Sequence, residues 1–91
     1  MRELERIQQA VREQRYRISS HANEEMSEDD LQVRDIESIL LTGKIIQRFT
    51  RDPRGARYEV AGNASDNRYG CVICRFLTSD LLLVITAFVP D

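Results

Sequence analysis

The hydrophobic periodicity of this 91-residue chain changes at Gly43, and this change limits the folds open to it. Before Gly43, apolar residues recur every three or four positions in the segments 2–15 and 33–41, which is typical of amphipathic helices. After Gly43, four apolar runs are separated by short turns, which predicts strands joined as antiparallel hairpins. We expect these strands at residues 44–50, 56–62, 69–78 and 81–90.

These segments predict one α+β domain in which the helices pack on one face of a four-stranded antiparallel sheet. The predicted parts of this single domain are an N-terminal helix in residues 1–15, short helices in residues 16–43 and the sheet in residues 44–91. Residues 16–20 are expected to be an extended link. Ser20 is expected to cap a short helix that runs to Met26.

Gly43 is expected to close the third helix in a left-handed conformation. The last strand is apolar on both faces, which places it in the interior of the sheet.

Composition and apolar run lengths argue against a membrane protein. Charged residues make up 31% of the chain and the longest apolar run, Leu81–Ile85, is far too short to span a bilayer. The first ten residues carry acidic side chains and lack the apolar core of a secretion signal. We therefore expect a cytoplasmic protein that does not contact a membrane.

The charge is distributed unevenly along the chain. The net charge of −2 combines a net −4 for residues 1–41 with a net +2 for residues 42–91. Five of the seven basic side chains of the second part lie close in sequence around a single acid, Asp52, and they are Lys44, Arg48, Arg51, Arg54 and Arg57. This segment is a candidate site for an anion or an acidic partner.

Cys71 and Cys74 have the C-x-x-C spacing of zinc and redox sites, but they lie in a predicted strand. Side chains alternate faces along a strand, so two cysteines three positions apart point to opposite sides of the sheet. The chain has one histidine and no other cysteine to complete four ligands. We therefore predict two buried structural thiols, with no bound metal and no cofactor.

His21 is the one histidine of the chain and lies in the first turn of the predicted short helix. Glu24 and Glu25, three and four positions later, would face it and could orient its ring for general acid or base chemistry. Two other interpretations stay open: that His21 only packs or caps the helix, and that it binds a metal with these glutamates.

Arg48, Arg57 and Arg75 fall on three successive predicted strands, with Tyr58 beside Arg57. If these strands are neighbours, their guanidinium groups could hold a phosphate and stabilise the charge of a phosphoryl transition state. Tyr58 could then stack on a base. The alternative is that these arginines are solvated and only protect the edges of the sheet from pairing with another strand.

Thr86 interrupts the apolar last strand. Its hydroxyl either lines a site or finds a hydrogen-bond partner within the sheet.

Three stretches give the chain a resemblance to a known family. They are His21-Ala22 followed by Met26, then Gly43-Lys44-Ile45-Ile46, then Ile85-Thr86 near Pro90. With these motifs, residues 15–91 resemble a bacterial family of small proteins, the domain-of-unknown-function family forty-two fifty-eight. The chain differs from many relatives at Glu25, where they carry arginine, and at Cys71, where they carry histidine.

The resemblance implies a RelE-like fold and the activity of RelE and MqsR toxins. Such a toxin of a type II toxin–antitoxin pair would be a metal-independent mRNA endoribonuclease, in some cases acting on the ribosome. Its partner would be an antitoxin with zinc-finger and helix-turn-helix architecture. On this reading His21, Arg57 and Arg75 are catalytic, and Arg48, Tyr58 and Thr86 bind the substrate.

Two other functions stay open at this point. The chain could be a non-catalytic module that seats an antitoxin or another protein, with the basic segment receiving an acidic chain. It could also be a metal-dependent hydrolase that uses His21, Glu24 and Glu25. Loss of activity with a chelator would favour the hydrolase, and partner binding without RNA cleavage would favour the module.

Overall fold

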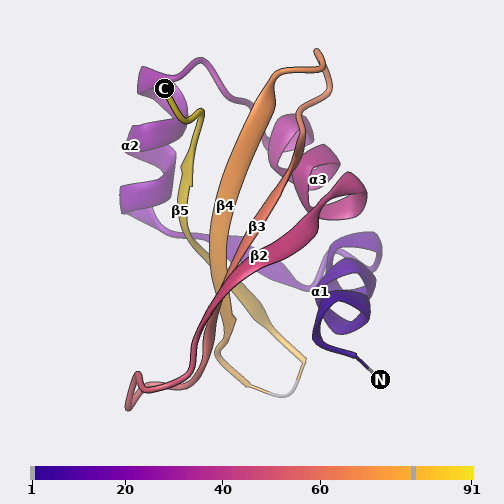
Figure 1. Cartoon of the computed structure of the whole chain (residues 1–91), viewed down its shortest axis with the longest axis vertical. Coiled ribbons are helices and arrows are strands. Elements are labelled where there is room, and N and C mark those ends of the chain that lie inside the picture. The colour runs from indigo at the N-terminus through magenta and orange to yellow at the C-terminus, as the bar shows by residue number, and fades with distance from the viewer. Residues whose placement is uncertain (1, 79) are drawn as a thin grey trace.

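The computed structural model describes residues 2–78 and 80–91, and these form three helices and one five-stranded sheet (Figure 1). The helices are α1 (Glu3–Arg12), α2 (Ser20–Glu28) and α3 (Val33–Thr42). The strands are β1 (Tyr16–Ile18), β2 (Lys44–Phe49), β3 (Arg57–Asn63), β4 (Tyr69–Phe76) and β5 (Leu82–Phe88). Residues 1 and 79, which fall within the predicted domain, lie outside the described residues. The predicted α+β class is confirmed.

The prediction of a purely antiparallel four-stranded sheet is wrong. The strand order is β1-β5-β4-β3-β2, and β1 pairs with β5 in parallel while the other neighbours are antiparallel. Backbone hydrogen bonds fix β1 at both ends, from the Leu82 N–H to the Arg15 carbonyl and from the Ser19 N–H to the Val84 carbonyl, each 3.0 Å. Three residues are too few to show a strand alternation, so the sequence pattern indicated only an extended link. β5 accordingly lies between β1 and β4.

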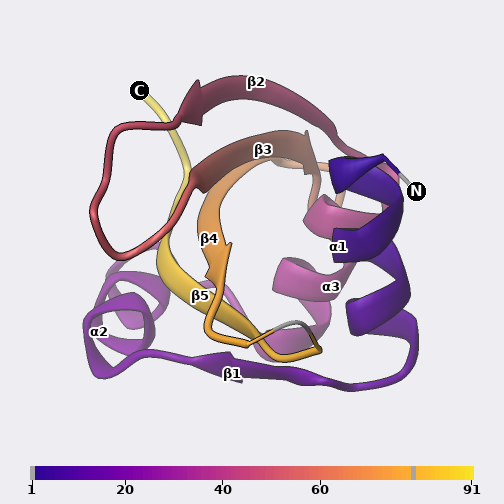
Figure 2. The same ribbon diagram turned by 90° about the horizontal axis from the view of Figure 1, so that it is seen from below.

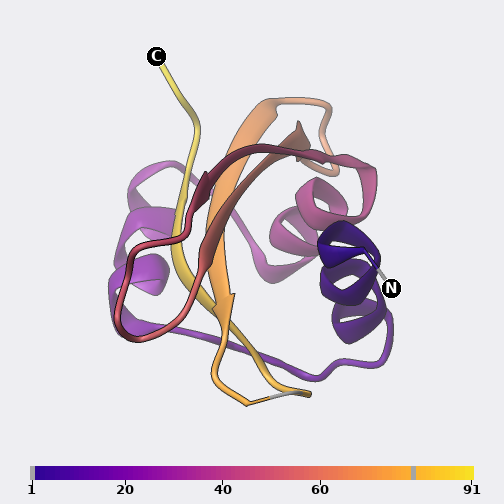
Figure 3. The ribbon, with the colours of Figure 1, turned by 60° about the horizontal axis from the view of Figure 1, so that its bottom comes forward.

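The sheet is curved, and α1 and α3 fill its concave side (Figure 2). Its buried side chains there come from alternate positions of neighbouring strands, such as Val60, Val72 and Val84, and they pack against Ile7 and Ile39 of the helices. The opposite face, called the outer face below, is turned away from α1 and α3 (Figure 3). By strand pairing, its members include Phe49, Arg57, Ile73, Arg75, Leu83 and Thr86.

α2 lies along the edge of β5, apart from α1 and α3 (Figure 2), and its buried Ala22 and Met26 still belong to the same hydrophobic core as the residues of those helices. β1 stops opposite Val84, so the edge of β5 beyond that point has no strand partner. Glu25 and Asp29 of α2 accept the N–H groups of Ala87 (3.3 Å) and Val89 (2.8 Å) there. Two carboxylates therefore satisfy a sheet edge that would otherwise be unpaired.

Two predicted helix ends differ in detail. Ser19, not Ser20, caps α2: its hydroxyl accepts the Ala22 N–H at 3.0 Å and donates to the Ile85 carbonyl at 3.0 Å. Gly43 follows α3 in an extended conformation (φ −87°) and is not left-handed. A Cβ at Gly43 would lie 2.5 Å from the Ile39 oxygen, so glycine is needed because α3 and β3 approach closely there.

Asp35 is the buried charged residue of the described chain and is 4% exposed. It lies in the first turn of α3 and accepts the Gln32 N–H at 2.8 Å, which is the capping-box arrangement. It also accepts the N–H of Ser65 at 3.0 Å and the Ser65 hydroxyl. One carboxylate thus joins the start of α3 to the β3–β4 loop.

Within residues 2–78 and 80–91, no helix combines the length and the apolar character needed to cross a membrane.

Candidate functional site

The β2–β3 connection is a tight turn whose sequence explains its shape. The Gly55 N–H donates to the Asp52 carbonyl at 3.0 Å, which closes a four-residue β-turn with Pro53 second and Gly55 fourth. Gly55 has φ +112°, a value that side-chain-bearing residues rarely adopt. The Asp52 carboxylate accepts the Arg54 N–H at 2.9 Å, as aspartates at the start of turns commonly do.

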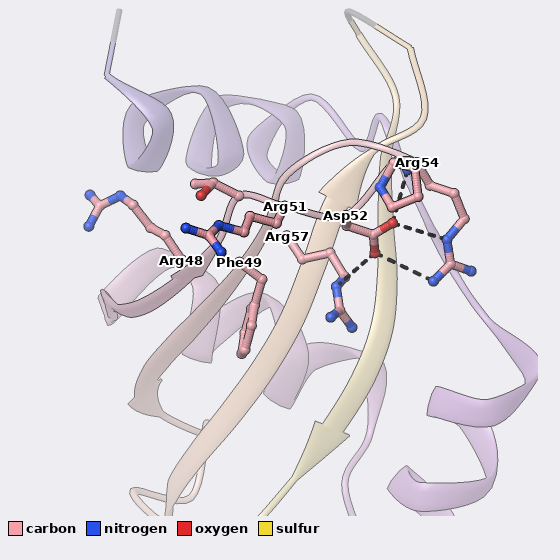
Figure 4. A pocket seen from close by; sticks show the side chains of 8 residues that line it. Arg48, Phe49, Arg51, Asp52, Arg54 and Arg57 are labelled. Atoms are coloured by element: carbon pink, nitrogen blue, oxygen red, sulfur yellow. Dashed lines mark hydrogen bonds and ion pairs between the residues drawn. The ribbon is translucent and has the colours of Figure 1, made fainter.

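This turn shapes a hollow of about 810 Å³, called the arginine pocket below (Figure 4). The pocket is lined by Arg48, Phe49, Thr50, Arg51, Asp52, Pro53, Arg54 and Arg57. Four of these eight residues are arginines and one is an acid, so the hollow is strongly basic. Guanidinium groups bind phosphate oxygens in a planar, two-pronged geometry, which makes this pocket a candidate anion site.

Arg57 is the most constrained arginine of the pocket. It stands opposite Phe49 in the β2–β3 ladder, and its guanidinium carbon lies 4.9 Å from the centre of the Phe49 ring. Its Nε lies 3.1 Å from Asp52 Oδ2, and its side chain is 33% exposed. A ring on one side and a carboxylate on the other hold the guanidinium in place, as Figure 4 shows.

Arg75 connects the outer face of β4 to the same loop. Its Nη1 donates to the carbonyl of Arg54 at 2.9 Å. Arg57 and Arg75 flank the paired residues Tyr58 and Cys74 and so face the same side of the sheet. The structure therefore puts Arg57 and Arg75 on the same face of the sheet beside the Arg54 loop, and it puts Arg57 in the same pocket as Arg48.

Arg48 and Tyr58 form a cross-strand pair on the side of α1. Arg48 Nε lies 3.2 Å from Glu3 Oε2 of α1 and the Arg48 side chain still lines the arginine pocket. Burial, and next the negative charge of Glu3, raise the pKa of Tyr58. Tyr58 thus faces α1, away from Arg57 and Arg75, and does not join them.

His21 lies on α2, and its side chain is 65% exposed. Its Nε2 is 3.3 Å from Glu25 Oε1, the carboxylate that also accepts the N–H of Ala87. Within the described chain, His21 has no hydrogen bond or ion pair with a pocket arginine. β4 and β3 separate β5, the strand beside α2, from β2.

Thr86 lies on the outer face opposite Ile73 and is half-buried, outside the lining of the arginine pocket.

No group of three or more histidine, cysteine, aspartate or glutamate side chains among residues 2–78 and 80–91 is arranged to hold a metal ion. In particular, no such group includes His21, Glu24 and Glu25, the three residues considered for metal binding.

Both cysteines are buried free thiols that point to opposite faces of β4, because their partners on β3, Ala61 and Tyr58, are three positions apart in a regular ladder. Burial, and next the nearby Glu59 carboxylate, raise the pKa of Cys71 to about 11. Burial alone raises the pKa of Cys74 to about 12. Both groups stay protonated at neutral pH and are therefore poor nucleophiles.

The sequence did not reveal that Phe49 lines the pocket or that Asp52 pairs with two of its arginines. The basic segment was visible, but composition does not reveal that Asp52 contacts two arginines at once. The available signals were the Asp-Pro-x-Gly order, which is typical of a β-turn, and the position of Phe49 just before it.

The comparisons with known proteins identify the family and nothing more specific. No curated protein and no solved structure matches the chain. A family model described as "Domain of unknown function (DUF4258)" matches residues 18–89, which leaves out α1 and includes α2, α3 and strands β2 to β5. Because this match extends over 72 of the 91 residues, the chain belongs to the DUF4258 family.

Proposed function

We propose that this protein is the toxin of a type II toxin–antitoxin pair, a RelE-like, metal-independent endoribonuclease that binds mRNA at the arginine pocket. The observation that carries the proposal is Arg57, which is held between Phe49 and Asp52 in a hollow lined by four arginines. A cluster of guanidinium groups on a loop offers RNA both charge neutralisation and a stacking surface.

Cleavage of this kind starts when a ribose 2′-OH loses its proton and attacks the adjacent phosphate to form a P–O2′ bond. The P–O5′ bond then breaks, the 5′ oxygen leaves and takes up a proton, and a 2′,3′-cyclic phosphate remains. Between these two events the phosphoryl oxygens carry extra negative charge, which Arg57 and Arg75 neutralise together with Arg54. Phe49 offers a ring against which an unpaired base can stack beside Arg57. A single-stranded RNA segment is the substrate that suits this combination of charges and an aromatic ring.

The role of His21 is considered separately from that of the arginine pocket. Its exposed ring, oriented by Glu25, can carry a proton, but it lies on α2 and makes no ion pair with the pocket arginines among the described residues. The arginine pocket therefore carries the proposal, and His21 is tested on its own.

The test measures cleavage and binding of a single-stranded RNA by the purified chain and by Arg57→Ala, His21→Ala and Arg12→Ala. Arg12 is an exposed arginine of α1 outside the pocket and serves as the matched control. We expect Arg57→Ala to weaken RNA binding about tenfold, to reduce the salt dependence by about one phosphate contact and to abolish cleavage. Arg12→Ala should leave all three unchanged.

Cleavage that persists in Arg57→Ala at an unchanged melting temperature would refute the arginine mechanism. Growth arrest on induction in a bacterial host, relieved by Arg57→Ala, would extend the result to toxicity. A neighbouring antitoxin, with zinc-finger and helix-turn-helix architecture, should then restore growth by binding the chain.

A second candidate function is a non-catalytic module that seats such an antitoxin or another protein. β2 is an edge strand, and Ile46 on it is 54% exposed, with the basic Lys44 and Arg48 on either side. An extended acidic segment of a partner could add to this edge. Partner binding that survives Arg57→Ala, with no RNA cleaved under any condition, would favour this function over the nuclease.

A further inference from the structure

Asp52 is the acidic residue of the arginine pocket and is nearly buried although it lies in a loop. Its side chain is 7% exposed. Its Oδ1 lies 3.3 Å from Arg54 Nε, and its Oδ2 lies 3.4 Å from Arg54 Nη2 and 3.1 Å from Arg57 Nε. Figure 4 shows both guanidinium groups directed toward this one carboxylate, with Arg48 and Arg51 on the other side of it.

The contact to Arg57 is an ion pair that lacks a directed hydrogen bond. Arg57 Nε is buried and has no hydrogen-bond partner among the described residues, although a carboxylate oxygen lies 3.1 Å away. A buried N–H without an acceptor costs free energy, because it has lost its bond to water. Arg57 therefore retains unused capacity for an anionic oxygen that approaches from a better direction.

The backbone of Asp52 is fixed independently of that ion pair. The Gly55 N–H holds its carbonyl, and the carbonyl of Arg54 is held from β4 by Arg75. A change of side-chain rotamer would uncover Arg54 and Arg57 and break the bond from the Arg54 N–H to the carboxylate, while the Gly55–Asp52 backbone bond would still close the turn. The backbone N–H of Arg54, followed by its side chain, lowers the pKa of Asp52, so the carboxylate is ionised at neutral pH.

We propose that Asp52 is a built-in competitor for the ligand of the arginine pocket: its carboxylate stands where a phosphate group would bind Arg54 and Arg57. A phosphate enters by displacing it, and Arg54 and Arg57 are paired with this carboxylate when nothing is bound. The identity of that phosphate as part of an RNA chain rests on the proposed function, whereas the competition itself does not. The carboxylate sets the affinity and limits unselective binding of weaker anions.

The chain offers a matched control for this inference. Asp66 repeats the Asp-x-Arg arrangement in the β3–β4 loop, where it accepts the Arg68 N–H at 3.1 Å and pairs with Arg68 Nε at 2.7 Å. Asp52→Asn and Asp66→Asn change the net charge equally, and both keep an oxygen that can accept the backbone N–H. Only the first removes a charge from the arginine pocket. Asp52→Ser, which also keeps a turn-capping oxygen, is the second test variant.

The experiment titrates the isotope-labelled chain with inorganic pyrophosphate and follows the Nε–H resonances of Arg54, Arg57 and Arg68 by NMR. We expect Asp52→Asn and Asp52→Ser to bind pyrophosphate about tenfold more tightly than the natural chain, the effect of one charge-assisted hydrogen bond. Only the pocket arginines should shift. Asp66→Asn should stay within about twofold of the natural chain, the range expected for a small long-range charge effect.

Equal tightening by Asp52→Asn and Asp66→Asn would overturn the inference, since net charge would then explain the effect. No tightening by either Asp52 variant, with the Arg54 and Arg57 resonances otherwise unchanged, would also overturn it.

The same variants titrated with single-stranded RNA separate this inference from the proposed function. If the Asp52 variants bind pyrophosphate more tightly but the chain neither binds nor cleaves RNA, the role of Asp52 as a competitor is supported and the proposed nuclease function is refuted. If RNA cleavage depends on Arg57 but the Asp52 variants bind pyrophosphate no more tightly, the nuclease function is supported and the role of Asp52 as a competitor is refuted.

Discussion

Replacing Asp35 with asparagine should destabilise the fold more than any comparable change of a charged surface residue. Asp35 is 4% exposed and accepts the N–H groups of Gln32 and Ser65 together with the Ser65 hydroxyl. An asparagine has one acceptor oxygen in place of two, and its amide group would be directed at one of the present donors. At least one buried N–H would lose its acceptor.

The expected loss follows from the bonds removed. A hydrogen bond to a charged group contributes about 1.5–3 kcal/mol, and a lost helix cap costs about 1 kcal/mol. The asparagine retains part of this network, so we expect Asp35→Asn to lower the free energy of unfolding by about 2 kcal/mol. In a domain of this size that corresponds to a fall in melting temperature of about 10 °C.

The loss should depend on pH in a defined direction. The Ser65 hydroxyl is the main cause that lowers the pKa of Asp35, with the N–H groups of Gln32 and Ser65 adding to it. Because the folded pKa lies below the unfolded value of about 4, ionisation stabilises the fold. This contribution is complete above the unfolded pKa and is lost as the pH falls through the folded pKa. The gap between natural and variant chains should therefore narrow below about pH 4.

Urea denaturation of both chains between pH 3 and pH 7 measures this gap, with Asp80→Asn as the control. Asp80 is exposed, so its replacement should change stability by less than about 0.5 kcal/mol at every pH. A gap in the free energy of unfolding below about 0.5 kcal/mol at pH 7 would refute the idea that Asp35 holds the start of α3 to the β3–β4 loop. A gap that widens as the pH falls would contradict the sign of the linkage.

Three further predictions concern other parts of the fold. Gly43→Ala should cost at least about 3 kcal/mol in urea denaturation, because its Cβ would lie 2.5 Å from the Ile39 carbonyl oxygen. Cys71 and Cys74 should react with a thiol reagent at pH 8 only after unfolding, since their pKa values are raised to about 11 and about 12; rapid labelling of the folded chain would contradict this. His21→Ala should change stability by less than about 0.5 kcal/mol, because the ring is 65% exposed; a larger loss in a melting experiment would indicate a packing role.

The long segments with a regular apolar spacing could be predicted from the sequence. The three-residue strand β1 and the contacts between distant segments could not. α3 and the four strands from β2 to β5 have apolar spacings that identify them within a few residues. The alternation rule also placed Cys71 and Cys74 on opposite faces, as the β3–β4 register has them. β1 was missed because three residues carry no pattern, and its pairing with β5 depends on backbone groups that every sequence has.

The arginine site was only half predictable for a related reason. A basic segment is visible in composition, but the face to which each arginine points depends on the register of the strands. Arg48 pairs with Tyr58 on the side of α1, while Arg57 faces the opposite side with Arg75. The role of Asp52 depends on the β2–β3 turn, which directs its carboxylate toward Arg54 and Arg57 later in the chain. The spacing of these residues in the sequence does not determine that direction.

The pairing of β1 with β5 also has a consequence for synthesis of the chain. The Ser19 hydroxyl and its hydrogen-bond partner, the Ile85 carbonyl, are 66 positions apart in the sequence. The segment that contains β1 therefore cannot pair until β5 has been synthesised. α1 and β1 leave the ribosome long before β5, which lies between β1 and the rest of the sheet. Contacts this distant in sequence slow folding. While β5 is still inside the ribosome, the nascent chain therefore carries β2, β3 and the arginine pocket on an unfinished sheet.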